Sequence, residues 1–212
     1  MKDRLAARLS ELGRAGDAEK TAAELVDRYN EPHRAYHNLD HIADCLEKLE
    51  LARPMLRRDE ADAVELALWF HDAVYDARAG DNEERSATLF REAAASHRLA
   101  APLAEKVERL ILLTKTHAPG ADAAEQAMID VDLSILGAPP SHFAAYDAAI
   151  RREYAHVPED IWRERRARVL AGFLARPRLF ATALFHERFD AQARENLSRA
   201  LAQLGRSNAP SK

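Results

Sequence analysis

The sequence predicts an all-α protein, built as a single-domain bundle of about nine to ten helices. Alanine, leucine, arginine and glutamate dominate its 212 residues and only 7 are glycine; the abundant residues are strong helix formers. Apolar residues recur at intervals of three and four rather than alternating, which is the helical periodicity. The apolar fraction of 47% is ordinary for a chain that builds a core. We expect one helical domain over residues 1–205 and a polar tail at 206–212.

Prolines mark most of the breaks between the predicted helices, because proline favours helix starts and connections. They are Pro32, Pro54, Pro102, Pro119, Pro139, Pro140, Pro158 and Pro177. Asp81, before the acidic turn "NEE", is an expected N-cap, and Ser141 is the expected cap of a later helix. The predicted helices cover residues 3–13, 17–30, 38–52, 59–75, 82–98, 100–116, 121–136, 141–155, 159–175 and 187–204.

Charge and composition narrow the functional classes. A net charge of −4 gives no electrostatic reason to expect binding to nucleic acid or to a membrane surface. No apolar run approaches the roughly 18 residues of a membrane span, and the charged segment "MKDRLAARLSEL" is no secretory signal. The single cysteine, Cys45, fits a reducing compartment. We therefore expect a cytoplasmic protein, whose oligomeric state stays open, a homodimer included.

The stretch "ALWFHDAVYD" places His71 and Asp72 inside an apolar run. Burying a neutral polar group without a partner costs roughly 2–7 kcal/mol, and an ionised group costs more. Neighbours on a helix point about 100° apart, so both cannot face solvent if their surroundings are core, but both can reach one ion beside that turn. Because two protein ligands hold an ion poorly, we expect further ligands from neighbouring helices.

Two other segments supply candidate ligands. In "PHRAYHNLDH", His37 and His41 are four residues apart, so they share a helix face if the helix reaches back to His37. In "MIDVDLSILG", Asp130 and Asp132 lie among apolar residues. One bound cation would satisfy all of these groups together. The competing interpretation is a buried histidine–aspartate pair that the backbone and a neighbouring arginine satisfy.

The ordered set of motifs resembles the HD superfamily of metal-dependent phosphohydrolases, and more closely a small bacterial branch of predicted phosphohydrolases within it. The motifs are "YNEPHRAYHNLDHI", "ALWFHDAVYD", "DNEERSA", "DVDLSILG" and "ARENL". They span nearly the whole chain. The resemblance implies an all-α HD-type fold that binds a metal ion.

The resemblance also implies the ligands of that ion. For the fourth ligand the resemblance favours Asp132, which follows Val131 and precedes the apolar "LSIL"; the register is one residue off the commonest form of the family pattern, so Asp130 stays open as the alternative. His37 is expected behind the ligands or beside the substrate. A mixed histidine and carboxylate set suits Mn, Fe, Co, Ni or Zn. The implied ligands are His41, His71, Asp72 and Asp132, with Asp130 as the alternative to Asp132.

The expected activity is hydrolysis of a small phosphate ester or nucleotide, since a divalent ion acidifies a bound water and polarises a phosphoryl oxygen. Arg34 and Lys115 are expected to neutralise the phosphate. The candidate catalytic residues are Asp72, Glu83, His117, Lys115 and Arg34. One alternative is an HD-fold protein that binds a nucleotide or partner without catalysis. Another is an HD-type di-iron oxygenase. Such an enzyme needs further histidine ligands for its second iron, and His97 and His117 are available for that role.

Overall fold

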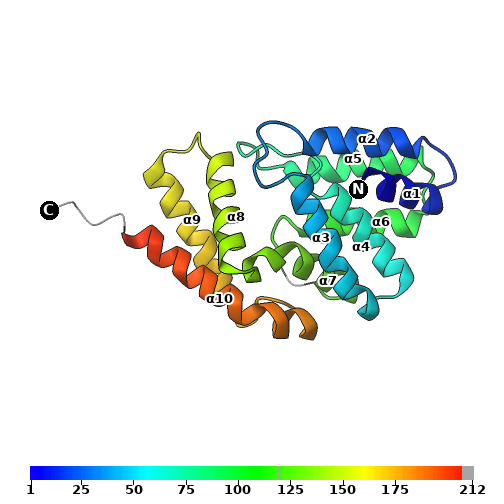
Figure 1. Ribbon diagram of the computed structural model, residues 1–212. Coiled ribbons are helices and arrows are strands. Elements are labelled where there is room, and N and C mark those ends of the chain that lie inside the picture. The colour runs from blue at the N-terminus through cyan, green and yellow to red at the C-terminus, as the bar shows by residue number, and fades with distance from the viewer. Residues whose placement is uncertain (119, 207–212) are drawn as a thin grey trace. The chain divides into compact units, whose positions relative to one another are not determined.

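The computed structural model describes residues 1–118 and 120–206. These residues form ten α-helices and two short 3₁₀ helices, and no strand (Figure 1). The predicted all-α class and the number of helices are confirmed. The proline break at Pro119 and the tail beyond Arg206 lie outside the described residues. The chain is divided into two compact units. The N-terminal unit ends at Asp132, and the C-terminal unit begins at Leu133.

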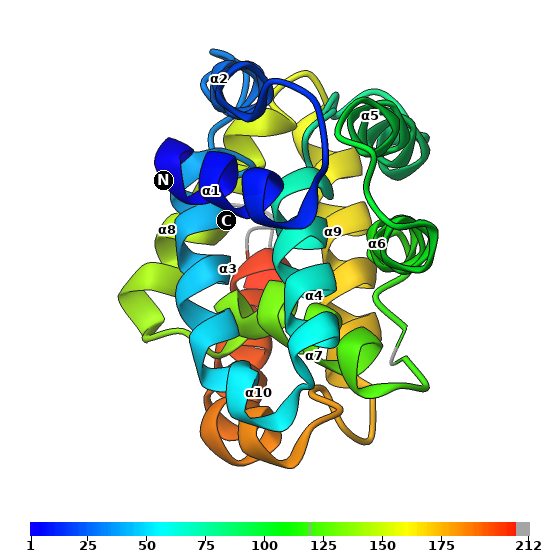
Figure 2. The same cartoon turned by 90° about the vertical axis from the view of Figure 1, so that its right-hand side faces the viewer.

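Helix α4 is the centre of the N-terminal unit. Every residue from Glu60 to Phe70 is buried, and α4 packs against α3, α5, α6 and α7 (Figure 2). A helix that is covered on all sides belongs in the middle of a core. The elements of this unit are α1 (Lys2–Leu12), α2 (Ala18–Tyr29), α3 (Leu39–Ala52), η1 (Arg53–Met55), α4 (Arg58–Phe70), α5 (Asn82–Ser96), α6 (Ala101–Leu113) and α7 (Ala123–Asp132).

The predicted helix over 59–75 is wrong at its end. Helix α4 stops at Phe70, so His71 and Asp72 lie in the turn that follows it. The His71 ring contributes to this end, because its Nδ1 donates to the Leu68 carbonyl, one of the groups that a helix end leaves without a helical partner. The polar pair therefore projects from the end of the central helix rather than from its flank.

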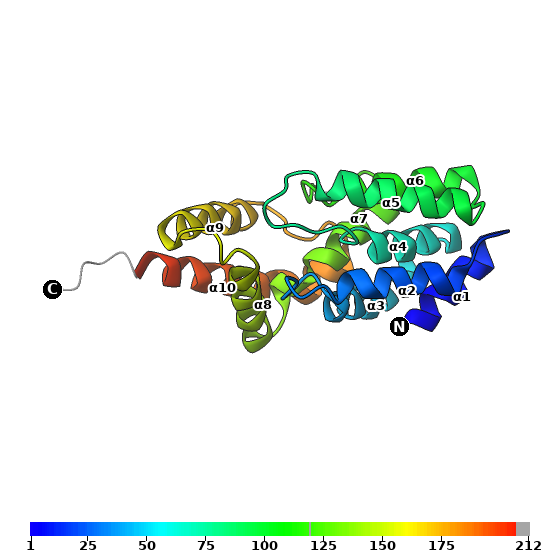
Figure 3. The ribbon, with the colours of Figure 1, turned by 90° about the horizontal axis from the view of Figure 1, so that it is seen from above.

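The C-terminal unit consists of helices α8, α9 and α10 with a short 3₁₀ helix before them. Helix α10 packs against α9 and η2 (Figure 3). The buried Asn196 side chain donates to the Leu136 and Ala138 carbonyls at 2.9 and 2.8 Å, which fixes α10 to the end of η2. The elements are η2 (Leu133–Gly137), α8 (Pro140–Glu153), α9 (Glu159–Leu174) and α10 (Ala183–Arg206).

Two of the smaller expectations differ from the structure. The predicted helix over 121–136 is α7 followed by η2, so Asp132 is the last residue of an α-helix. Ser141 does not cap α8, which begins at Pro140, because proline suits the first turn, where the N–H has no helical partner. Asp81 is the N-cap of α5, as predicted, without a side-chain capping bond.

Among the described helices, none combines the length and the apolar character of a membrane span.

Candidate metal centre

Three segments that are distant in the sequence bring their polar side chains to one point of the N-terminal unit. His41 on α3, His71 after α4 and Asp132 at the end of α7 each offer a ligand atom, and these atoms all lie within 4.8 Å of one another. The two Nε2 atoms are 3.3 Å apart. Asp132 Oδ1 is 3.4 Å from His41 Nε2 and 3.6 Å from His71 Nε2.

Asp72 joins this group from the same turn as His71. Its Oδ2 lies 3.0 Å from His71 Nε2 and 3.5 Å from His41 Nε2. The side chain is 19% exposed, against 2 to 3% for the two imidazoles. We call these four residues, His41, His71, Asp72 and Asp132, the His/Asp cluster.

The N-terminus of α3 sets the place of His41. The Asn38 side chain accepts hydrogen bonds from the Asp40 and His41 amides at 2.9 and 3.3 Å, which is the geometry of an N-cap. His41 therefore lies in the first turn of the helix. His37 precedes the cap, so α3 does not reach back to it, and the two histidines do not share a face of one helix.

One hydrogen bond fixes the tautomer of neutral His71. Its Nδ1 lies 3.0 Å from the Leu68 carbonyl, which can only accept, so Nδ1 carries the hydrogen. In the neutral ring, Nε2 then presents a lone pair. This lone pair faces the carboxylate oxygens of Asp72 and Asp132, which are acceptors too. Acceptors that face one another at this range need a cation or protons between them.

Burial and charge act against each other in the His/Asp cluster. Burial lowers the pKa of His41 and His71. Cys45 and Tyr36, followed by the two carboxylates, outweigh it at His41, and Asp72 and Asp132 outweigh it at His71, so both pKa values lie well above their ordinary range. Burial raises the pKa of Asp72 and Asp132, but the surrounding imidazoles hold both pKa values well below that range. The cluster therefore favours two ionised carboxylates together with positive charge between them, which protonated imidazoles or a bound cation can supply.

The structure separates the two acids between which the fourth ligand was open. Asp132 Oδ1 faces the imidazoles, whereas its Oδ2 accepts a hydrogen bond from His117 Nε2 at 3.0 Å. Asp130 is fully buried on the same helix, and the ligand atoms that lie within 4.8 Å of one another come from His41, His71 and Asp132. Side chains two positions apart on a helix, such as Asp130 and Asp132, point about 200° apart, so only one of these two acids can face α3. His117 has a φ of 48°, in the left-handed region that non-glycine residues rarely adopt.

A group of half-buried aromatic rings lies beside the cluster. The His37 ring stacks on Tyr75, with centroids 4.1 Å apart, and meets Tyr36 edge-on at 5.1 Å. The Tyr36 ring in turn lies 4.7 Å from the ring of His41. Charge on His37 is among the causes that lower the pKa of Asp72. His37 is therefore close to the cluster without being one of its members.

Arg34 does not have the role that the sequence predicted. Its side chain is fully buried. The guanidinium donates to the carbonyls of His37, Asp72 and Ala73 and to the Glu31 carboxylate. A guanidinium with these partners is not open to a substrate phosphate, so the predicted phosphate contact is wrong for Arg34.

Lys115 and Glu83 lie near the start of α5. Lys115 Nζ donates to the Gly80 carbonyl at 3.0 Å and pairs with Glu84. The hydrogen bond to Glu84 raises the pKa of Lys115, and Glu83 adds to that shift. Glu83 is half-buried in the first turn of α5. The predicted contacts of Lys115 and Glu83 with a substrate stay predictions.

Cys45 is a neighbour of the cluster that the sequence analysis did not connect with it. Its Sγ lies 3.7 Å from both ring nitrogens of His41, and its side chain is buried. The signal was present in the sequence, because Cys45 follows His41 by four residues and therefore lies one turn along the same helix face.

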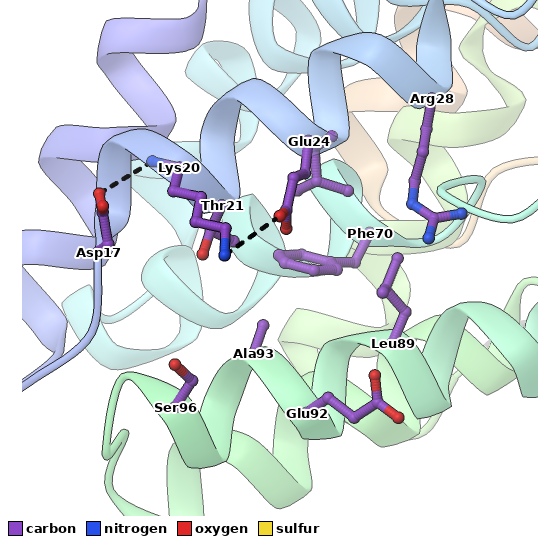
Figure 4. Close-up of a pocket in the computed structure, with 11 residues that line it drawn as sticks. Asp17, Lys20, Thr21, Glu24, Arg28, Phe70, Leu89, Glu92, Ala93 and Ser96 are labelled. Carbon is purple, nitrogen blue, oxygen red and sulfur yellow. Dashed lines mark hydrogen bonds and ion pairs between the residues drawn. The ribbon is translucent and has the colours of Figure 1, made fainter.

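A separate groove lies between α2 and α5, with a volume of about 300 Å³ (Figure 4). Phe70 is among the residues that line it, together with Lys20, Arg28, Glu24 and Glu92 on the two helices. None of the four cluster residues lines this groove. Its charged residues have both signs, so they do not select a ligand of one charge.

No protein-family model, no curated protein and no solved structure matches the chain. The chemistry of the His/Asp cluster is therefore argued from its own geometry.

Proposed function

We propose that this protein is a metal-dependent phosphohydrolase that acts on a small phosphate ester or nucleotide, with one divalent transition-metal ion at the His/Asp cluster. The observation that carries the metal is the orientation of His71, whose Nδ1 is held by the Leu68 carbonyl so that its Nε2 faces two carboxylates. The phosphoryl chemistry is supported by the resemblance of the motifs to HD phosphohydrolases.

The residues of the cluster fit such an ion. They offer two imidazole nitrogens and two carboxylates, a mixed set that suits Mn, Fe, Co, Ni or Zn. Two ionised carboxylates balance the charge of a divalent cation, and three separate segments hold the donors in place. When bound, the ion supplies a Lewis acid for the phosphoryl oxygen and a water of lowered pKa.

The other side chains divide the remaining tasks. Asp72 is the most exposed member of the cluster, so in this proposal it meets the attacking water and accepts its proton. His117 is 31% exposed and holds Asp132 Oδ2, which leaves Oδ1 for the ion. Lys115, 41% exposed, is the cation proposed for the substrate phosphate. Glu83 is proposed as a further site residue near it.

Two observations favour one ion over the two that a di-iron oxygenase needs. His97 is fully buried, and its Nδ1 and Nε2 lie 3.1 Å from the Ala15 carbonyl and 2.9 Å from the Thr21 hydroxyl. Both nitrogens are thus occupied away from the cluster. Among the described residues, three or more histidine, cysteine and acidic side chains come within metal-binding range at one place only.

Elemental analysis of the purified protein is the first test. We expect about one equivalent of a transition metal in the wild type and none in the double variant His71→Ala/Asp72→Ala. The matched control is His142→Ala, which removes an exposed imidazole on α8 and should retain the metal. The metal-loaded proteins are then tested against phosphate esters and nucleotides, and hydrolysis should follow the metal content.

Each other result assigns a different function. Two equivalents of iron would favour the oxygenase. One metal ion without any phosphate-ester or nucleotide hydrolysis would favour a binding or regulatory protein. No metal after reconstitution with each of the five candidate ions would contradict the proposal, and the cluster would then be a buried set of imidazolium–carboxylate pairs.

A further inference from the structure

Arg34 is a buried cation in the loop between α2 and α3, and its hydrogen bonds join two loops. Nη1 donates to the His37 carbonyl at 3.0 Å and to the Asp72 carbonyl at 2.7 Å. Nη2 donates to the Ala73 carbonyl at 3.1 Å, and Nε to the Glu31 carboxylate at 3.0 Å. One side chain thus holds the backbone of the loop before α3 and of the turn after α4.

Two aromatic rings also contact the same guanidinium. Its carbon lies 5.2 Å from the ring centroid of the buried Tyr29 and 5.7 Å from that of Tyr75, within the range of cation–π attraction. The Tyr75 ring stacks on His37. Tyr29, Arg34, Tyr75 and His37 therefore form a continuous series of contacts from the core to the side of the cluster.

We propose that Arg34 is the positioning residue of the candidate metal centre, which it builds by tying the loop that carries His37 to the turn that carries Asp72. The part of this inference that concerns metal rests on the function proposed above. The carbonyls of Asp72 and Ala73 lie beyond the end of α4, and Arg34 donates a hydrogen bond to each of them. With its carbonyl held from behind, the Asp72 side chain is directed toward the two imidazoles.

The geometry requires arginine rather than any cation. A guanidinium is planar and carries its N–H donors on three nitrogens, so it can reach separate carbonyls and still contact two rings. A lysine ammonium has all its donors on one nitrogen and no flat face. Arg34→Lys therefore keeps the positive charge but cannot keep the four contacts.

The test compares Arg34→Lys with Arg53→Lys in the full-length protein. Arg53 contacts Glu50 and Glu65 in a different ionic group, so it provides the same substitution away from the two loops. We expect Arg34→Lys to bind Co²⁺ about 10- to 100-fold more weakly than the wild type, with an altered visible spectrum. Arg53→Lys should lower the melting temperature and leave the Co²⁺ affinity and spectrum unchanged.

Hydrogen exchange without metal gives a second measurement. The amides of Asn38, Ala73 and Val74 are hydrogen-bonded in the two loops. They should exchange faster in Arg34→Lys and at the wild-type rate in Arg53→Lys. If Arg34→Lys does not fold, Tyr75→Leu replaces it, which removes one of the two rings and should weaken Co²⁺ binding by less than about tenfold.

The outcomes separate this inference from the proposed function. Wild-type Co²⁺ affinity in Arg34→Lys, or in Tyr75→Leu where that variant replaces it, would overturn the positioning role. Equal weakening in Arg53→Lys would overturn it too, because the cause would then be a general loss of stability. If the wild type binds neither Co²⁺ nor any of the other four candidate ions, the proposed metal centre fails, and exchange alone decides whether Arg34 ties the loops. Unchanged exchange at all three amides would then refute it.

Discussion

Glu65 on α4 is the buried centre of an ionic group, and its replacement by glutamine should destabilise the N-terminal unit. Its side chain is fully buried. Arg4 Nε lies 2.8 Å from one carboxylate oxygen, Arg8 Nη2 lies 3.1 Å from the other, and Arg53 pairs with the same oxygen as Arg8. One carboxylate thus holds α1 and η1 against the central helix.

The size of the effect follows from burial. Glu65→Gln keeps the volume and removes the charge, so three guanidinium groups lose their shared partner. Removing one partner of a buried ion pair costs about 3–5 kcal/mol. The three arginine side chains remain 18 to 37% exposed, and water compensates part of the loss, so we expect the lower end, about 3 kcal/mol. The melting temperature should fall by about 6–12 °C.

Urea and thermal unfolding at pH 7, followed by circular dichroism, measure this change. The matched control is Glu50→Gln. Glu50 contacts two of the same arginines, Arg4 and Arg53, but its side chain is 50% exposed, so its loss should cost under about 1 kcal/mol. A change of less than about 0.5 kcal/mol for Glu65→Gln, typical of a surface substitution, would refute the reasoning.

The effect should also depend on pH. Burial raises the pKa of Glu65, but the arginines outweigh it and hold that pKa below its ordinary value. A carboxyl group with a lowered folded-state pKa stabilises the fold above its unfolded pKa, about 4.3, and the contribution is lost as the pH falls through the folded value. The stability difference between wild type and Glu65→Gln should therefore be complete at pH 7 and shrink below about pH 4. A difference that grows in acid would contradict the ionised state of Glu65.

Three further predictions concern the His/Asp cluster. Co²⁺ at 100 times its dissociation constant should raise the free energy of unfolding by about 2.7 kcal/mol, an effect that EDTA reverses and Asp132→Asn greatly reduces in thermal scans. His117→Asn tolerates a positive φ and can still donate to Asp132, so its Co²⁺ affinity should exceed that of His117→Gly by about tenfold in a competition titration. The buried Cys45 thiol should react with a disulfide reagent only as fast as the protein opens, and equal rates in native and denatured protein would contradict its burial.

The sequence predicted helices best where the signal for an end is local. The predicted helix over 159–175 is Glu159–Leu174 in the structure, because Pro158 fixes the start. The end of α4 at Phe70 was missed, since the apolar pattern continues through Ala73 and Val74. What ends that helix is tertiary: Arg34 takes the carbonyls after it, and the Ser86 hydroxyl takes the Val74 amide.

The candidate site divides in the same way. Polar residues in apolar segments predicted that His71, Asp72 and Asp132 would need common partners, and the structure brings them together. The resemblance favoured Asp132 but left Asp130 open, because the choice depends on the rotation of α7 against α3, which no local pattern contains. The predicted phosphate contact of Arg34 is wrong for a related reason. A basic residue beside two histidines gives the same sequence pattern whether its side chain faces solvent or the core.

The end of α4 connects the fold with the site. A longer helix would have bonded the carbonyl of Leu68 and kept Asp72 on the helical path, about 100° away from His71. Because the helix stops, Leu68 receives the His71 Nδ1 hydrogen, and this leaves the His71 Nε2 lone pair for the cluster. The carbonyl of Asp72 receives the Arg34 guanidinium instead of a helical amide. The end of the helix at Phe70 thus leaves the Leu68 and Asp72 carbonyls without helical partners. Their new partners select the tautomer of His71 and the direction of Asp72, so these adjacent residues can bind one ion.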